Sequence, residues 1–163
     1  MENPRMESPR IDSHAAVRVL LVDDDPDGAN STAMLLRHFG AEAHAICDPR
    51  LACDEACAFE PDLLLIDLSM PHLDGCAVAR QLRGRRQFDS TPLVVVSGHA
   101  DPEQRALCAA AGFDQYLVKP VPLEIFVRLL DEVGRAKAIA AEAHVQSPHD
   151  FEYDPTAARI ARP

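Results

Sequence analysis

The most regular feature of the chain is a set of five short apolar runs separated by longer amphipathic segments. The runs cover residues 17–22, 41–46, 63–66, 93–96 and 115–118. The first, third and fourth are nearly continuous Val, Leu and Ile, which is typical of strands buried on both faces of a sheet. The second run, AEAHAI, alternates polar and apolar residues and predicts a strand at the edge of the sheet.

The segments between the runs carry the signals of α-helices. Three Asp-Pro pairs place a side-chain acceptor before a proline at the first helical position, at Asp25-Pro26, Asp48-Pro49 and Asp101-Pro102. Two later segments repeat apolar residues at helical spacing, namely Gly75, Val78, Ala79 and Leu82, and then Phe126, Leu129, Leu130 and Val133. Strand and helix alternate five times, which predicts an α/β protein with a parallel sheet and helices on both of its faces.

A single folded domain accounts for most of the 163 residues. Residues 16–136 contain all five runs and the helical segments between them. The polar, proline-containing start, MENPR followed by MESPR, predicts a disordered lead over residues 1–15. The Ala-rich stretch after Lys137, which breaks at Ser147-Pro148, predicts a helical extension and a flexible tail over residues 137–163.

Net charge and composition narrow the possible partners. The chain has 16 Lys and Arg against 26 Asp and Glu, and the formal charge is −10. An acidic chain is a poor binder of nucleic acid or of anionic membranes, but it attracts divalent cations and basic partners. No apolar run approaches the roughly 20 residues of a membrane span, and the start has no apolar signal segment. Four arginines, at positions 80, 83, 85 and 86, are interpreted as a solvated helix end.

Five cysteines, at positions 47, 53, 57, 76 and 108, are present without a CxxC pair. This spacing favours free thiols over a disulfide framework or a zinc site. Free thiols are typical of a reducing compartment, so we expect a cytoplasmic protein.

Polar side chains follow four of the five predicted strands. Asp23 and Asp24 follow the first strand, Asp67 the third, Ser97 the fourth and Lys119 the fifth. Ligands of parallel α/β sheets bind outside the carboxyl ends of the strands, so we expect these groups to share one cleft. Clustered carboxylates without His or Cys suit Mg²⁺ better than Zn²⁺. A carboxylate in such a cleft can also form an aspartyl phosphate, with the metal ion and the ammonium neutralising phosphoryl oxygens.

Residues 16–136 resemble the receiver domain of two-component response regulators, of the chemotaxis-protein type. The matching segments are VLLVDDDPD, LLLIDLSMPHLDG, VVVSGHA and YLVKP, in this order. The resemblance implies a flavodoxin-like (βα)5 fold, a doubly wound sheet of five parallel strands in the order 2-1-3-4-5. It also implies a cis peptide bond at Lys119-Pro120.

The resemblance assigns a role to each strand-end residue. It implies that Asp67 is the phosphoacceptor, and that Asp23, Asp24, Asp67 and the backbone carbonyl of Ser69 hold Mg²⁺. Lys119 would bind the phosphoryl group. Ser97 would be the switch hydroxyl and Tyr116 the switch aromatic residue. The side chains of Ser69 and His99 occupy positions that tune hydrolysis of the phosphoryl group in the family.

The implied function is that of a switch rather than of an enzyme that turns over an external substrate. A sensor histidine kinase or a histidine phosphotransfer protein would donate the phosphoryl group. A downstream protein would then bind the face made by the fourth helix, fifth strand and fifth helix. Since only 27 residues follow position 136, we expect a stand-alone receiver without direct nucleic-acid or membrane binding. Two outputs stay open, namely partner binding and transfer onward in a phosphorelay.

Three other interpretations are weaker. Asp25-Pro26-Asp27-Gly28 resembles the start of a haloacid-dehalogenase-type phosphatase, but a later acidic motif at a strand end is missing, since Asp131-Glu132 falls in a helical pattern. A nucleotide-binding flavodoxin-like module would need a Gly-rich phosphate loop after the first strand. A degenerate receiver that acts only as a scaffold would lack one of the key residues, and all are present.

Overall fold

The structure is a computed structural model that describes residues 16–71, 73–99 and 101–145. The predicted disordered lead and residues 146–163 of the predicted tail lie outside the described residues. Five strands form one parallel sheet in the order β2-β1-β3-β4-β5. They are β1 (Arg18–Val22), β2 (Glu42–Ile46), β3 (Leu63–Asp67), β4 (Leu93–Ser97) and β5 (Gln115–Val118). The predicted fold class and strand order are confirmed, and β2 is an edge strand as its alternating pattern indicates.

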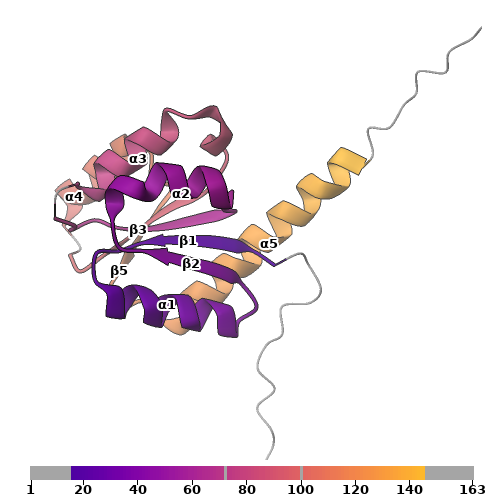
Figure 1. Cartoon of the computed structure of the whole chain (residues 1–163), viewed down its shortest axis with the longest axis horizontal. Helices are drawn as coiled ribbons and strands as arrows, with labels where there is room; N and C mark the ends of the chain where they lie inside the picture. The colour runs from indigo at the N-terminus through magenta and orange to yellow at the C-terminus, as the bar shows by residue number, and fades with distance from the viewer. Residues whose placement is uncertain (1–15, 72, 100, 146–163) are drawn as a thin grey trace, which may run out of the picture.

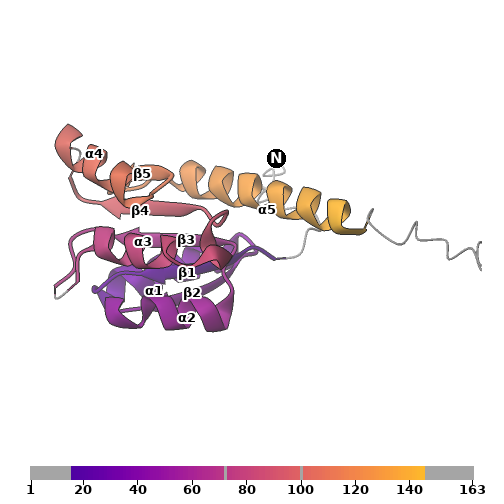
Figure 2. The same ribbon diagram turned by 90° about the horizontal axis from the view of Figure 1, so that it is seen from above.

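Helices cover both faces of the sheet (Figures 1 and 2). They are α1 (Pro26–His38), α2 (Ala52–Phe59), α3 (Gly75–Arg83), α4 (Pro102–Ala111) and α5 (Leu123–Val145), with short 3-10 turns η1 (Pro49–Leu51) and η2 (Arg86–Phe88). Two apolar cores result, because α2, α3 and α4 pack on one face and α1 and α5 on the other. The apolar stripes predicted for the third and last helices are buried in these cores.

All three Asp-Pro pairs place an Asp cap before a helical turn, two at the start of an α-helix and one at a 3-10 turn. The Asp25 carboxylate accepts hydrogen bonds from the backbone N–H groups of Asp27 and Gly28, and Asp101 accepts one from Glu103. Asp48 instead caps η1, a single turn closed by a bond from the Leu51 N–H to the Asp48 carbonyl. The tight turn replaces the start of an α-helix there, and α2 begins only at Ala52.

The interpretation of Arg83 as part of a solvated helix end is wrong. Its guanidinium donates to the carbonyls of Gly112, Phe88 and Thr91, and it pairs with Asp114 at 2.7 Å. Arg83 therefore ties the end of α3 to the start of β4 and to the turn between α4 and β5.

The described part of the chain contains no helix both long enough and apolar enough to cross a membrane. The longest helix, α5, projects beyond the sheet in both ribbon views (Figures 1 and 2). Its Lys137 ammonium pairs with Asp62 at 2.6 Å and donates to the Ala16 carbonyl at 3.2 Å. These contacts hold the middle of α5 against the amino end of β1 and the residue before β3.

Candidate functional site

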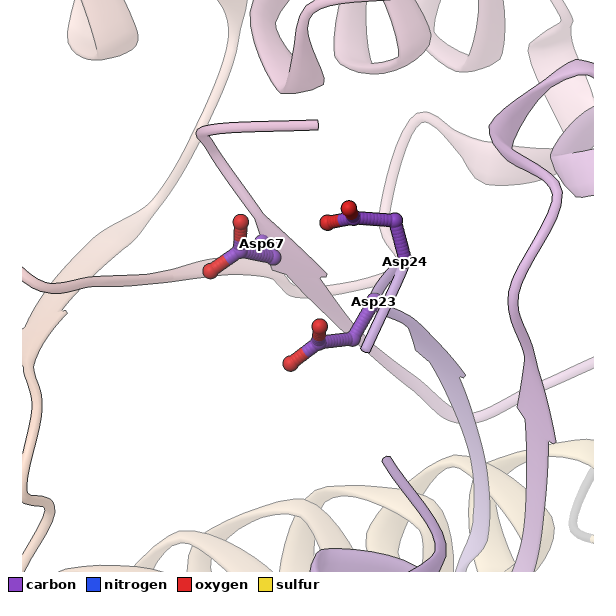
Figure 3. Close-up of side chains that lie close together, drawn as sticks. All are labelled: Asp23, Asp24 and Asp67. Atoms are coloured by element: carbon purple, nitrogen blue, oxygen red, sulfur yellow. The ribbon is translucent and has the colours of Figure 1, made fainter. Parts of the chain in front are cut away.

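Three carboxylates converge at the carboxyl ends of β1 and β3 (Figure 3). Asp23 and Asp24 directly follow β1, and Asp67 is the last residue of β3. β1 and β3 are neighbours in the sheet, with Val22 opposite Ile66. One oxygen from each of the three side chains lies within 4.8 Å of the others. The parallel register therefore brings together groups that lie 44 residues apart in the sequence, as the strand-end pattern predicts.

Lys119 bridges two of these carboxylates. Its Nζ donates to Asp67 Oδ1 at 2.8 Å and to Asp23 Oδ2 at 3.0 Å. Burial by itself would lower the pKa of Lys119, but the hydrogen bonds and charges of Asp67 and Asp23 outweigh it and raise this pKa. The ammonium therefore stays protonated throughout the neutral range and offsets the repulsion between the two carboxylates.

Asp67 is the most enclosed acidic group of the site, with 8% of its surface exposed. Its second oxygen, Oδ2, accepts the backbone N–H of Ser69 at 2.9 Å. The Asp24 carboxylate, by contrast, makes no hydrogen bond or ion pair with the described residues. An all-oxygen set of this kind, with one carboxylate uncommitted, fits a hard divalent cation such as Mg²⁺.

Close packing at Gly75 fixes the end of β3 that carries Asp67. A Cβ atom at Gly75 would lie 2.4 Å from the Asp67 carbonyl oxygen, and the Gly75 N–H donates to the Leu68 carbonyl at 3.3 Å. The start of α3, capped by Asp74, can approach β3 this closely only where no side chain intervenes.

Ser97 and Lys119 reach the same end of the sheet from β4 and β5. Asp67 lies opposite Val96 in the β3–β4 register, so Ser97 is the next residue along. The Lys119 N–H donates to the Ser97 carbonyl at 2.8 Å. The Lys119-Pro120 peptide bond is cis, which confirms the prediction. Ser97 itself is buried, with 1% of its surface exposed.

Two hydrogen bonds at the His99 backbone connect Ser97 to Tyr116. The His99 N–H donates to Ser97 Oγ at 3.3 Å, and the Tyr116 hydroxyl donates to the His99 carbonyl at 2.9 Å. The Arg105 guanidinium carbon lies 4.6 Å from the centre of the Tyr116 ring, in cation–π contact. Sequence reasoning missed Arg105, because it lies outside the quoted motifs and its partner Tyr116 is on another element.

Two predicted tuning positions, Ser69 and His99, have exposed side chains near the cluster. The dehalogenase-like segment does not form a second site. Asp25 is used as the N-cap of α1, Asp27 is exposed in its first turn, and Asp131-Glu132 lies within α5.

Comparison with known proteins identifies the family. The response regulator receiver domain family matches residues 19–131. Response regulator MprA of Mycobacterium tuberculosis is 34% identical over 149 residues, which cover 90% of this chain and 64% of the relative. The chain thus matches about two thirds of that longer protein. It belongs to the response regulator receiver domain family.

Solved structures agree with this assignment. Chemotaxis protein CheY4 of Vibrio cholerae matches with a TM-score of 0.69 at 28% identity, covering 73% of this chain and 99% of that one. The receiver domain of sensor histidine kinase PA1611 from Pseudomonas aeruginosa matches with a TM-score of 0.67 at 28% identity, covering 74% and 99%. That structure has a magnesium ion coordinated in its active-site cleft. The chain is therefore a receiver domain of two-component signalling, a class of protein that acts as a signalling switch.

Proposed function

We propose that this receiver domain takes a phosphoryl group onto Asp67 in the presence of Mg²⁺, and that the modified site changes the surface formed by α4, β5 and α5. The observation that carries the proposal is the cluster itself. Three carboxylate oxygens lie within 4.8 Å of one another, and Lys119 bridges Asp67 and Asp23. Carboxylates held this closely repel one another, and a divalent cation bound beside Lys119 would relieve that repulsion.

Asp67 is the group best placed to act as the nucleophile. A carboxylate oxygen of Asp67 would attack the phosphorus of a phosphohistidine, so that a P–O bond forms as the P–N bond breaks and the histidine leaves with a proton. The Lys119 ammonium, which now donates to the Asp67 carboxylate, would then donate to the phosphoryl oxygens. Asp23, Asp24, Asp67 and the Ser69 carbonyl would hold Mg²⁺, which supplies positive charge to the transferred group when bound.

The Ser97 hydroxyl is the group that would couple phosphorylation of Asp67 to the surface formed by α4, β5 and α5. If Ser97 Oγ turns to donate to a phosphoryl oxygen, the hydrogen bond that it accepts from the His99 N–H is lost. The His99 carbonyl accepts a hydrogen bond from the Tyr116 hydroxyl. Movement of this short segment would therefore release Tyr116 from its present contacts, including the one with Arg105.

Receiver domains interact with histidine kinases and with downstream proteins, and we propose the same two kinds of partner here. A sensor kinase or a histidine phosphotransfer protein would approach the carboxyl ends of β1, β3 and β4. The downstream protein would bind the surface formed by α4, β5 and α5. A stand-alone receiver and the domain limits at residues 16 and 136 stay predictions, since the MprA relatives are longer than the match. The hydrolysis-tuning roles of Ser69 and His99 also stay predictions.

The experiment is phosphorylation by a small-molecule donor, with the intact mass as readout. The chain is incubated with acetyl phosphate and Mg²⁺, and we expect one added phosphoryl group. Asp67→Asn should prevent the addition, and a chelator should prevent it in the unchanged chain. Asp27→Asn is the matched control, because it makes the same chemical change at an exposed carboxylate in the first turn of α1.

Two results would contradict the proposal. One is an adduct that persists in Asp67→Asn. The other is the absence of an adduct together with no Mg²⁺-dependent consumption of the donor, because rapid hydrolysis would still consume it.

A further inference from the structure

Two buried cysteines face each other between α3 and α4. Cys76 is in the first turn of α3 and Cys108 in the last turn of α4, with 5% and 1% of their surfaces exposed. Their Sγ atoms lie 3.7 Å apart, although the residues are 32 positions apart in the sequence. Neither sulfur has another hydrogen-bond partner among the described residues. The pair therefore stands as two free thiols in direct contact.

The two α2 thiols have different surroundings. Cys53 Sγ contacts the Gln81 side-chain oxygen at 3.7 Å. Cys57 Sγ accepts hydrogen bonds from Arg85 at 2.8 Å and from Gln87 at 3.2 Å. Only Cys76 and Cys108, among the described cysteines, have sulfur as their side-chain hydrogen-bond partner.

The helix that carries Cys108 is weakly held. Cys108 and Ala111 are the only residues of α4 that are buried, and Leu107 is 55% exposed. A helix that buries so little side-chain surface opens locally at a much lower cost than the whole domain. Such opening would give a small oxidant access to the two thiols, which the packed structure shields.

We propose that Cys76 and Cys108 form a redox modification site, at which a hydroperoxide oxidises the two thiols to a disulfide that joins α3 to α4. The short distance between the sulfur atoms and the weak burial of α4 carry this proposal.

The chemistry balances with a hydroperoxide as the oxidant. Burial raises the pKa of both thiols, that of Cys108 to about 12, and at Cys76 a hydrogen bond with Cys108 partly counteracts this. When α4 opens locally, the thiolate of one of the two cysteines attacks a peroxide oxygen, which breaks the O–O bond and leaves a sulfenic acid on that cysteine. The sulfur of the other cysteine then displaces hydroxide from the sulfenic acid and forms the disulfide. The two thiols lose two electrons and two protons, and hydrogen peroxide is reduced to two water molecules.

A bond at this position would fix α4 on α3. The α4 helix follows the Ser97–His99 segment, so its restraint would oppose the movement proposed for Ser97, His99 and Tyr116. This consequence rests on the proposed function, whereas formation of the disulfide does not.

The test exposes the full chain to hydrogen peroxide and maps its disulfides without reduction. Cleavage before aspartates separates the cysteines, because it releases Cys76 in residues 74–88, Cys108 in 101–113, Cys53 in 48–53 and Cys57 in 54–61. We expect a link between 74–88 and 101–113, removed by dithiothreitol. The linked chain should melt higher by roughly 10 °C, since cross-links of this loop length restrict the unfolded state.

The unchanged chain gives the decisive result, so no variant that could fail to fold is required. Cys57→Ala is the matched control and should form the same link, whereas Cys76→Ala should not. The proposal fails if Cys76 and Cys108 stay reduced while Cys57 is oxidised, or if they link to other cysteines instead.

Acetyl phosphate then separates this proposal from the proposed function. Acetyl phosphate should phosphorylate the oxidised chain about fivefold more slowly than the reduced chain. This factor lies in the usual range of energetic coupling between two sites. Equal rates would overturn the link to phosphorylation. A chain that forms the disulfide, but in neither state gains a phosphoryl group or consumes acetyl phosphate with Mg²⁺, would overturn the proposed function and leave the redox site supported.

Discussion

Gly75 is a small residue on which the geometry of Asp67 depends. The backbone oxygen of Asp67 occupies the space that a Gly75 side chain would need, at 2.4 Å from an ideal Cβ. The obstacle is main chain rather than a flexible side chain, so it cannot move without moving Asp67. Gly134 differs, because its Cβ would meet only a Val17 methyl group at 3.5 Å, an ordinary contact distance.

We therefore expect Gly75→Ala to lower the free energy of unfolding by about 1–3 kcal/mol, the usual cost of an overpacked site. It should also reduce Asp67 phosphorylation by acetyl phosphate. Gly134→Ala, within α5, should instead stabilise the protein by about 0.5–1 kcal/mol, because alanine favours a helix. Urea denaturation measures both changes. Equal stability of the two variants would show that the close approach at Gly75 has no consequence.

At the scale of elements, Arg83 holds three segments together. Its guanidinium donates hydrogen bonds to the carbonyls of Phe88 in η2, Thr91 before β4 and Gly112 after α4. It also donates to the carboxylate of Asp114. Asp114 in turn accepts the Leu93 N–H at 2.8 Å. A lysine would keep the charge but not the planar fork that satisfies these acceptors simultaneously.

Arg83→Lys should accordingly cost about 1–3 kcal/mol of stability, since partly buried carbonyls lose their donors. Arg80→Lys is the matched control on the same helix, and as an exposed substitution it should change stability by no more than about 0.5 kcal/mol. Thermal or urea unfolding of the two variants checks this. A loss in Arg83→Lys no larger than that in Arg80→Lys would contradict the role of Arg83.

Some of these features could be predicted from the sequence and others could not. The positions of Asp23, Asp67, Ser97 and Lys119 could be predicted because parallel strands deliver their last residues to one edge of a sheet. The roles of Arg83 and Arg105, and the Cys76–Cys108 contact, could not. They depend on how helices separated by many residues pack against one another, and the spacing of residues along the chain does not encode that.

At the scale of the whole molecule, the helices are held to the sheet unequally. On one face, α5 buries a continuous apolar stripe, and its Lys137 is anchored to Asp62. On the other, α2 and α3 are well buried, whereas α4 buries only two residues. The weakly held helix follows the strand that ends in Ser97, and it carries Arg105, which contacts Tyr116. We infer that a signal from Asp67 would reach the surface formed by α4, β5 and α5 through α4 and β5, while the Lys137–Asp62 pair keeps the middle of α5 in place.

The most direct test of this account is a two-dimensional amide NMR spectrum of the labelled chain, recorded with Mg²⁺ before and after addition of beryllium fluoride, a mimic of the phosphoryl group. We expect the signals of Ser97, His99 and Tyr116 to shift together with those of Asp67, and we expect none of these shifts in Asp67→Asn. Changes confined to the acidic cluster, with His99 and Tyr116 unmoved, would contradict the proposed switch. Equal changes in Asp67→Asn would contradict the phosphoacceptor assignment itself.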